Sequence, residues 1–162
     1  MLAHSLAHRS SETVAAALRA AEDLCRHRSV RFTPMRRMVL ECLWQSHRAI
    51  GAYDLIRIME ARLGRQLSPP SVYRALDFLL EQGLVSRLET MNAFVPSAHP
   101  DHHHACVFFI CEHCGSSAEV ENAKLESLLS RDAAALGFRV DRRVVELQGL
   151  CAHCVSAELG AN

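Results

Sequence analysis

The sequence predicts an α+β protein of two modules, an N-terminal winged-helix domain followed by a small α/β domain. Three observations predict this. Apolar residues recur every three or four positions through the first 83 residues, which is the period of helices that bury one face. Two strand-like runs, at 84–89 and 92–95, follow these helices directly. Two Cys-x-x-Cys motifs then bracket much of the remaining chain.

The N-terminal module is expected to hold four helices. The first covers residues 11–28, where Val14, Leu18 and Cys25 share one face. The next three have capping signals at their ends. The second helix starts at Thr33 and Pro34, and the third runs between Gly51 and Gly64. The fourth starts at Ser68 and Pro69 and ends at Gly83. A hairpin after the fourth helix gives the winged-helix arrangement, in which the last helix enters the DNA major groove.

The rest of the chain divides into a hinge and a second module. Residues 96–105 hold two prolines and four histidines, which suit neither a helix nor a strand. We therefore expect domains at 1–95 and 106–162, joined by this hinge. The second domain should contain strands at 106–110, 118–120 and 138–147 and a helix at 122–136. The residues expected to face its core are Leu125, Leu128, Leu129, Leu136, Val140, Val144 and Leu147.

Charge is unevenly distributed, although the formal net charge is zero. Residues 1–92 carry 13 Arg against 9 acidic residues, a net charge of +4. Residues 93–162 carry 5 Lys or Arg against 9 acidic residues, a net charge of −4. The basic part uses arginine alone, which suits recognition of phosphate and guanine. The asymmetry indicates that the two modules have different partners.

The sequence also indicates where in the cell the protein is located. No uninterrupted run of about 18 apolar residues is present, and the first residues lack the apolar segment of a signal peptide. We therefore expect a cytoplasmic protein with no membrane partner, where disulfides are rare. Five of the seven cysteines and six of the ten histidines lie after residue 92. Metal binding is the favoured use for them.

The two Cys-x-x-Cys motifs predict one structural zinc ion, held by four sulfurs in a tetrahedron. The ligands are Cys111, Cys114, Cys151 and Cys154. The 36 residues between the motifs exceed a zinc-finger spacing, so the metal would join the ends of the second module. Free buried thiols, or a redox switch with an exposed low-pKa thiol, are the alternatives. His113 and His153 lie inside the motifs, as alternative ligands or as solvated side chains.

The histidine-rich hinge is a candidate for a second, exchangeable metal. His99, His102 and His104 lie close to Asp101, and Glu119 supplies a nearby carboxylate. Mixed nitrogen and oxygen ligands on a loop favour a divalent ion that binds reversibly. Such an ion could fix the angle between the modules and so act as a switch. A solvated, nonspecific histidine loop is the alternative.

The fourth helix carries the case for DNA binding. With its apolar stripe inward, it presents Ser71, Tyr73 and Arg74 near its N-terminal end. Arginine can bind O6 and N7 of guanine together, and serine or tyrosine can hold phosphates. Tyr53 at the start of the third helix and Arg36 at the start of the second could add contacts. Each would be an ordinary surface residue by itself, and only the joint pattern predicts a DNA interface.

One segment around the fourth helix reads PPSVYRALDFLLEQG, at residues 69–83. It resembles the Fur family of metal-dependent transcriptional repressors, and most of all the zinc uptake regulators within that family. Supporting stretches lie at 31–36, 52–55, 109–114 and 149–154. The resemblance covers residues 12–156, and its central segment is far more specific than either Cys-x-x-Cys motif.

The resemblance implies a homodimer with an N-terminal domain for double-stranded operator DNA and a C-terminal dimerisation domain. It implies two zinc ions per chain, a structural ion on the four cysteines and a regulatory ion at the hinge. The regulatory ion would favour the DNA-binding dimer and so repress genes for zinc uptake. By position, Tyr53 and Arg74 match DNA contacts of the family, and His104 and Glu119 match two regulatory ligands.

The regulatory ligand set departs from the family pattern at two positions. A ligand histidine of the pattern falls on Ser86 and a ligand cysteine falls on Ser97, and serine hydroxyls are poor zinc ligands. The candidates to replace them are His99, His102, His103 and Cys106. The identity of the sensed metal therefore rests on the overall resemblance, and a family member that senses iron or manganese is the alternative.

Two other classes of function are alternatives to a repressor, and each requires different features of the sequence. A metal-dependent enzyme would need an open zinc position and a general base, for which Glu119 is a candidate, but no substrate-pocket signature accompanies it. A zinc-storage or chaperone protein would not need the recognition helix. The sequence therefore favours a repressor, which is not an enzyme and has no small-molecule substrate.

Overall fold

The computed structural model describes residues 3–5, 11–46, 48–97, 100, 106–140 and 143–159. The chain divides into two compact units. The N-terminal unit is residues 6–101, and the C-terminal unit joins residues 1–5 to residues 102–162. None of the helices in the described ranges is long and apolar enough to cross a membrane.

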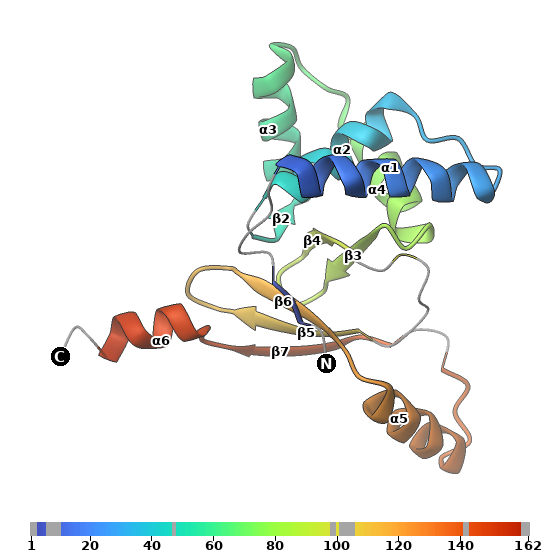
Figure 1. The fold of residues 1–162 in the computed structure, drawn as a ribbon, viewed down its shortest axis with the longest axis vertical. Helices are drawn as coiled ribbons and strands as arrows, with labels where there is room; N and C mark the ends of the chain where they lie inside the picture. The colour runs from blue at the N-terminus through green and yellow to red at the C-terminus, as the bar shows by residue number, and fades with distance from the viewer. Residues whose placement is uncertain are drawn as a thin grey trace. The chain divides into compact units, whose positions relative to one another are not determined.

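Helices and a small sheet make up the N-terminal unit (Figure 1). The helices are α1 (Ser11–His27), α2 (Pro34–Gln45), α3 (Ala52–Leu63) and α4 (Pro69–Glu81). The antiparallel sheet has the order β2 (Ile50–Gly51), β4 (Ala93–Pro96) and β3 (Val85–Leu88). The predicted helices and hairpin are thus present, and β2 is an additional strand that pairs with β4.

Local capping explains several of these boundaries. The Thr33 side chain accepts a hydrogen bond from the main-chain N–H of Arg36 at 3.4 Å, which caps α2. Gly83 follows α4 with a φ of 70°, a conformation that a residue with a Cβ rarely adopts. A Cβ at this position would also lie 3.1 Å from the carbonyl oxygen of Pro100. Glycine is therefore required here both by the backbone and by its neighbour.

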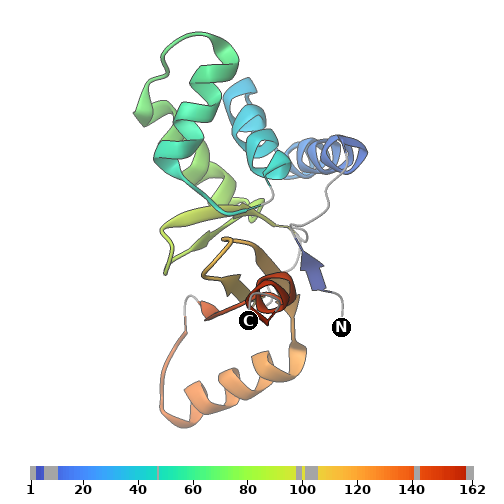
Figure 2. The same ribbon diagram turned by 90° about the vertical axis from the view of Figure 1, so that its left-hand side faces the viewer.

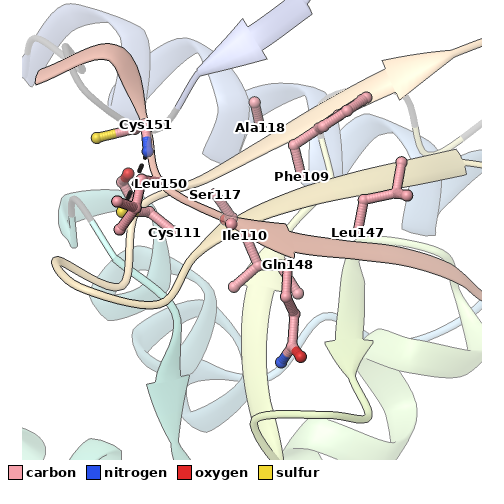
Figure 3. A pocket seen from close by; sticks show the side chains of 11 residues that line it. Phe109, Ile110, Cys111, Ser117, Ala118, Leu147, Gln148, Leu150 and Cys151 are labelled. Carbon is pink, nitrogen blue, oxygen red and sulfur yellow. Dashed lines mark hydrogen bonds between the residues drawn. The ribbon is translucent and has the colours of Figure 1, made fainter. Parts of the chain in front are cut away.

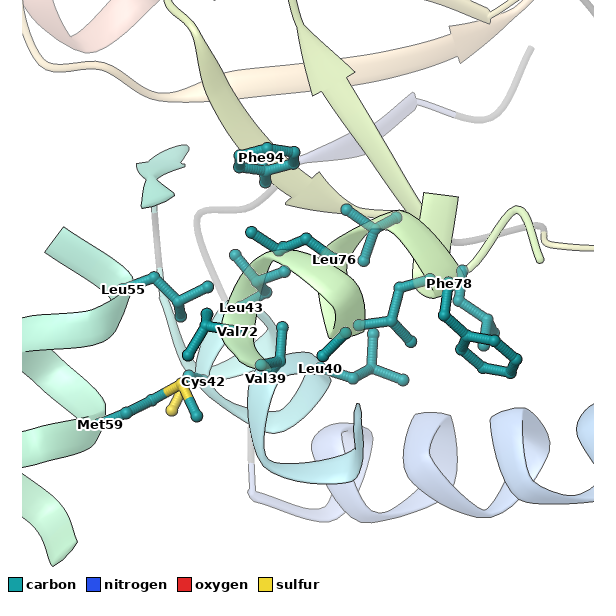
Figure 4. Packing of buried hydrophobic residues seen from close by; sticks show 14 of the residues in the cluster. Val39, Leu40, Cys42, Leu43, Leu55, Met59, Val72, Leu76, Phe78 and Phe94 are labelled. Carbon is teal, nitrogen blue, oxygen red and sulfur yellow. The ribbon is translucent and has the colours of Figure 1, made fainter. Parts of the chain in front are cut away.

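The core of the N-terminal unit holds α4 in place (Figure 4). Apolar side chains of α2, α3 and α4 meet in this cluster, together with residues of α1 and the sheet. Leu43, Leu55 and Leu76 are each at most 1% exposed. Burial of one leucine side chain contributes about 1.5–3 kcal/mol, so these contacts fix the orientation of α4 on α2. The predicted inward stripe of α4 is confirmed, since Val72 and Leu79 are also fully buried.

The C-terminal unit is built on a mixed four-stranded sheet with the order β1-β6-β5-β7. The strands are β1 (Ala3–Ser5), β5 (Cys106–Cys111), β6 (Ser117–Glu121) and β7 (Val145–Gly149), and the helices are α5 (Ala123–Ala135) and α6 (Ala152–Leu159). Strand β5 is antiparallel to β6 and parallel to β7. Strand β1 comes from the stretch expected in the N-terminal domain, but it pairs with β6.

The second module differs from expectation in two respects. The strand expected at 138–147 starts only at Val145, and helix α6 was not expected. The predicted core positions of α5 are also wrong for a single chain, because no residue of α5 is buried. Leu136 is 74% exposed, and Figures 1 and 2 show α5 standing apart from the sheet. Val140, Val144 and Leu147 are exposed as well. Periodicity identifies an apolar face but not what covers it.

Candidate metal centre and nucleic-acid interface

Parallel pairing of β5 with β7 brings the two Cys-x-x-Cys motifs together. Cys111, the last residue of β5, lies opposite Gly149, the last residue of β7. The main-chain N–H of Glu112 donates to the carbonyl of Gly149 at 2.9 Å, which extends the pairing. Because parallel strands end at the same edge of a sheet, each strand delivers its motif to one place.

The four sulfur atoms have the spacing of a tetrahedral metal site. All four lie within 4.8 Å of one another, and Cys114 Sγ is 3.8 Å from Cys151 Sγ. Zn–S bonds of about 2.3 Å in a tetrahedron require sulfur atoms about 3.8 Å apart. Each cysteine is a free thiol, and Cys111 and Cys154 are buried. The donor set and its spacing therefore fit a closed structural zinc site.

The sulfur atoms differ in how readily they ionise. Main-chain N–H groups of Cys114 and then Cys151 lower the pKa of the Cys111 thiol to about 6. The main-chain N–H of Cys154 lowers the pKa of Cys151. Burial, followed by the neighbouring sulfur atoms, raises the pKa of Cys154 to about 12. Close negative charges oppose one another, so four thiolates require a cation among them.

Two further side chains lie against these sulfur atoms. His113 Nδ1 is 3.4 Å from Cys154 Sγ, and Ser116 Oγ is 3.1 Å from Cys114 Sγ. The sequence presents His113 as an alternative ligand or a solvated side chain, whereas the structure places it in hydrogen-bonding contact with a cysteine. Its position inside the motif is the only signal in the sequence, and this signal does not separate it from His153.

Three of the predicted DNA contacts are exposed on α3 and α4. Tyr53, the second residue of α3, is 77% exposed, and Tyr73 on α4 is 39% exposed. Arg74 is exposed and donates from Nε to the Pro70 carbonyl at 3.2 Å, which orients it at the first turns of α4. Ser71 is half-buried near the start of the same helix. Three of the predicted residues thus lie along the N-terminal half of α4.

Arg36 is engaged inside the N-terminal unit. Its guanidinium lies over the Phe78 ring and donates to the main-chain carbonyl of Arg31. Phe78 lies one turn beyond Arg74, so the structure does not group Arg36 with the first turn of α4. The DNA contact of Arg36 stays a prediction, and its contact with Phe78 is a role that the sequence did not indicate.

Comparison with known proteins decides the family. Residues 27–148 match the model of the ferric uptake regulator family, which is more than half of the chain. The chain belongs to the ferric uptake regulator family. It is 42% identical over 139 residues to the zinc uptake regulation protein of Escherichia coli (strain K12), covering 85% of this chain and 81% of that protein.

Other comparisons agree with this family membership. The chain is 32% identical over 146 residues to the peroxide operon regulator of Bacillus subtilis (strain 168), covering 87% of this chain and 95% of that protein. Among solved structures, it resembles a zinc uptake regulator complexed with zinc and DNA, with a TM-score of 0.87 and 39% identity. That match covers 93% of this chain and 99% of the other.

The regulatory site predicted for this family member falls largely outside the described residues. Its candidate ligands His99, His102 and His104 all lie there. Glu119 lies on β6 of the C-terminal unit and is 9% exposed. Ser86 and Ser97, which stand at two ligand positions of the family pattern, belong to the N-terminal unit. The regulatory ligand set therefore stays a prediction.

A pocket of about 310 Å³ opens on the C-terminal sheet of this ferric uptake regulator family member (Figure 3). Phe109, Leu147 and Leu150 line it together with Cys111 and Cys151. Its lining contains neither a carboxylate nor an imidazole, and its ionisable groups are the Cys111 and Cys151 thiols of the candidate metal centre.

Proposed function

We propose that this chain is a zinc-responsive repressor that binds operator DNA as a homodimer and acts on genes for zinc uptake. The observation that carries the proposal is the exposed Arg74 on α4, in a chain that resembles a zinc uptake regulator bound to zinc and DNA. Arginine at the first turns of a recognition helix can bind guanine in the major groove. Such a repressor would act in the cytoplasm.

Zinc has two roles in this proposal. One ion is structural and is held by the four cysteines, whose sulfur spacing fits it. A second ion is regulatory and binds at the hinge, with His104 and Glu119 as its first candidate ligands. His102 and His99 complete the set, because serine occupies both remaining positions of the family pattern. The four-cysteine ion stabilises the C-terminal unit, and the hinge ion changes DNA affinity.

The exposed apolar surface of the C-terminal unit supports the homodimer. Large apolar side chains exposed in this number on one unit favour burial against a partner, because leaving them in water costs free energy. A second copy of the chain can bury these side chains, because its own C-terminal unit exposes the same apolar residues. The residues are Phe109, Leu128, Leu136, Phe138, Val140, Val144, Leu147, Leu150 and Val155.

A mobility-shift measurement tests the function directly. The chain, with its tight zinc in place, is titrated onto an AT-rich palindromic operator with and without added zinc. We expect added zinc to raise the affinity strongly. A change of less than about threefold, a coupling of under about 1 kcal/mol, would contradict the proposed switch. Zinc binding with no affinity for any duplex would instead indicate a storage protein.

A further inference from the structure

In the described residues, main-chain N–H groups act on two of the four sulfur atoms of the proposed zinc site. The main-chain N–H of Cys151 donates to Cys111 Sγ at 3.3 Å, and the main-chain N–H of Cys154 lowers the pKa of Cys151. Cys111 and Cys151 are each the first cysteine of their motif. Backbone amides are fixed by the fold, so these two thiolates keep their donors whatever side chains surround them.

Side chains contact the second cysteine of each motif. Ser116 Oγ lies 3.1 Å from Cys114 Sγ, and His113 Nδ1 lies 3.4 Å from Cys154 Sγ. Within the described residues, no main-chain N–H or hydroxyl donates to Cys154 Sγ, so His113 is its one donor other than the cysteines. Cys154 is also 4% exposed, so water does not replace that donor readily.

The direction of this hydrogen bond follows from the metal chemistry. Zinc binds cysteine as a thiolate, which has no proton to give. In the loaded site the imidazole must therefore donate, with its hydrogen on Nδ1. His113 belongs to the first motif and Cys154 to the second, 41 residues apart, so the bond links the two motifs directly.

We propose that His113 is a positioning residue of the zinc site, which holds the Cys154 thiolate on the ion. A hydrogen bond to a metal-bound thiolate withdraws charge from the sulfur and fixes the side-chain rotamer. The fixed rotamer makes the sulfur slower to leave the zinc, and the withdrawn charge makes it slower to react with an electrophile. The inference rests on the four-cysteine zinc site proposed above. It assigns a role at that site to His113, which is not one of the four ligands.

The second motif provides a matched control. His153 occupies the same position in Cys151-Ala-His-Cys154 as His113 does in Cys111-Glu-His-Cys114. It is exposed, and within the described parts of the chain it donates to no cysteine. Replacement of either histidine removes the same imidazole from the same motif position. Only the replacement of His113 removes a donor from a sulfur atom.

The test uses the full chain, loaded with zinc and dialysed so that only the tightly held ion remains. Wild type, His113→Ala, His113→Asn and His153→Ala are compared. Two rates are measured, zinc transfer to 4-(2-pyridylazo)resorcinol and alkylation of each cysteine by N-ethylmaleimide, the latter by peptide mass spectrometry. Asparagine keeps an N–H donor the same number of bonds from the backbone as Nδ1.

We expect His113→Ala to accelerate zinc transfer and Cys154 alkylation by about fivefold, the effect of losing one modest hydrogen bond. His153→Ala should leave both rates unchanged, and His113→Asn should restore most of the protection. If His113→Ala cannot retain zinc at all while the other two variants do, the inference is supported more strongly.

Two results would overturn the inference, and they are distinguishable. If wild type, His113→Ala and His153→Ala bind zinc and share one Cys154 alkylation rate, His113 has no positioning role and the zinc site stands. If the dialysed wild type carries no zinc on its cysteines, the zinc site itself is wrong and the inference falls with it.

Discussion

The guanidinium carbon of Arg36 lies 3.5 Å from the centre of the Phe78 ring. Arg36 is in the first turn of α2, and Phe78 is in the second half of α4, so the pair joins the two helices. Phe78 is 8% exposed, and partial removal from water strengthens the attraction between a cation and an aromatic face. Arg36 therefore helps to hold α4 against α2, in addition to any contact with DNA.

Replacement of Arg36 should destabilise the N-terminal unit. We expect Arg36→Ala to lower the free energy of unfolding by about 1 kcal/mol, measured by urea denaturation, because the cation–aromatic contact is lost. Arg37→Ala is the matched control, since Arg37 makes a half-exposed ion pair with Glu22 at 3.2 Å, and such a pair contributes little to stability. Equal stability of the two variants would contradict the role given to Phe78.

Replacement of Arg74 should remove operator selectivity. The ratio of dissociation constants for operator and scrambled duplex, at one fixed salt concentration, is the relevant measurement. Arg74→Ala should reduce this ratio by about tenfold or more, because a paired contact with guanine contributes about 1–3 kcal/mol. Arg19→Ala, an exposed change on α1 with the same loss of charge, should preserve the ratio. Unchanged selectivity in Arg74→Ala would exclude it as a base-reading residue.

Replacement of Glu60 should loosen the turn that leads into α4. Glu60 Oε1 accepts a hydrogen bond from the main-chain N–H of Leu67 at 2.8 Å, and Leu67 is 7% exposed. Glu60→Ala leaves this N–H without an acceptor, at a cost of about 1–2 kcal/mol in the free energy of unfolding. Glu60→Gln retains an acceptor oxygen and should lose less. The prediction is wrong if urea denaturation finds both variants equally unstable.

Zinc content should separate the two proposed metal sites. After dialysis, wild type and His104→Ala should each retain about one zinc per chain, because the closed four-cysteine site releases its ion slowly. Cys154→Ser should retain none and should unfold at a lower temperature, since loss of a structural zinc removes binding free energy from the folded state. Loss of all metal from His104→Ala, with retention in Cys154→Ser, would show that the two roles are reversed.

The N-terminal unit could be predicted almost completely from the sequence, because its signals are local. Apolar spacing marks the buried face of α1 and α4, and Thr33, Gly64 and Gly83 mark helix ends through hydrogen bonds and backbone angles within a few residues. The four cysteine ligands could likewise be predicted from the sequence, since two Cys-x-x-Cys pairs in one chain have few functions other than metal binding.

Only the tertiary structure decided how distant segments meet. The parallel pairing of β5 with β7 and the addition of β1 to the C-terminal sheet depend on contacts far apart in the chain, for which the sequence has no local signal. The same pairing brings His113, and not His153, to a sulfur atom of the opposite motif. The residues of the proposed zinc site were thus determined by the sequence, and the neighbours that contact them were determined by the fold.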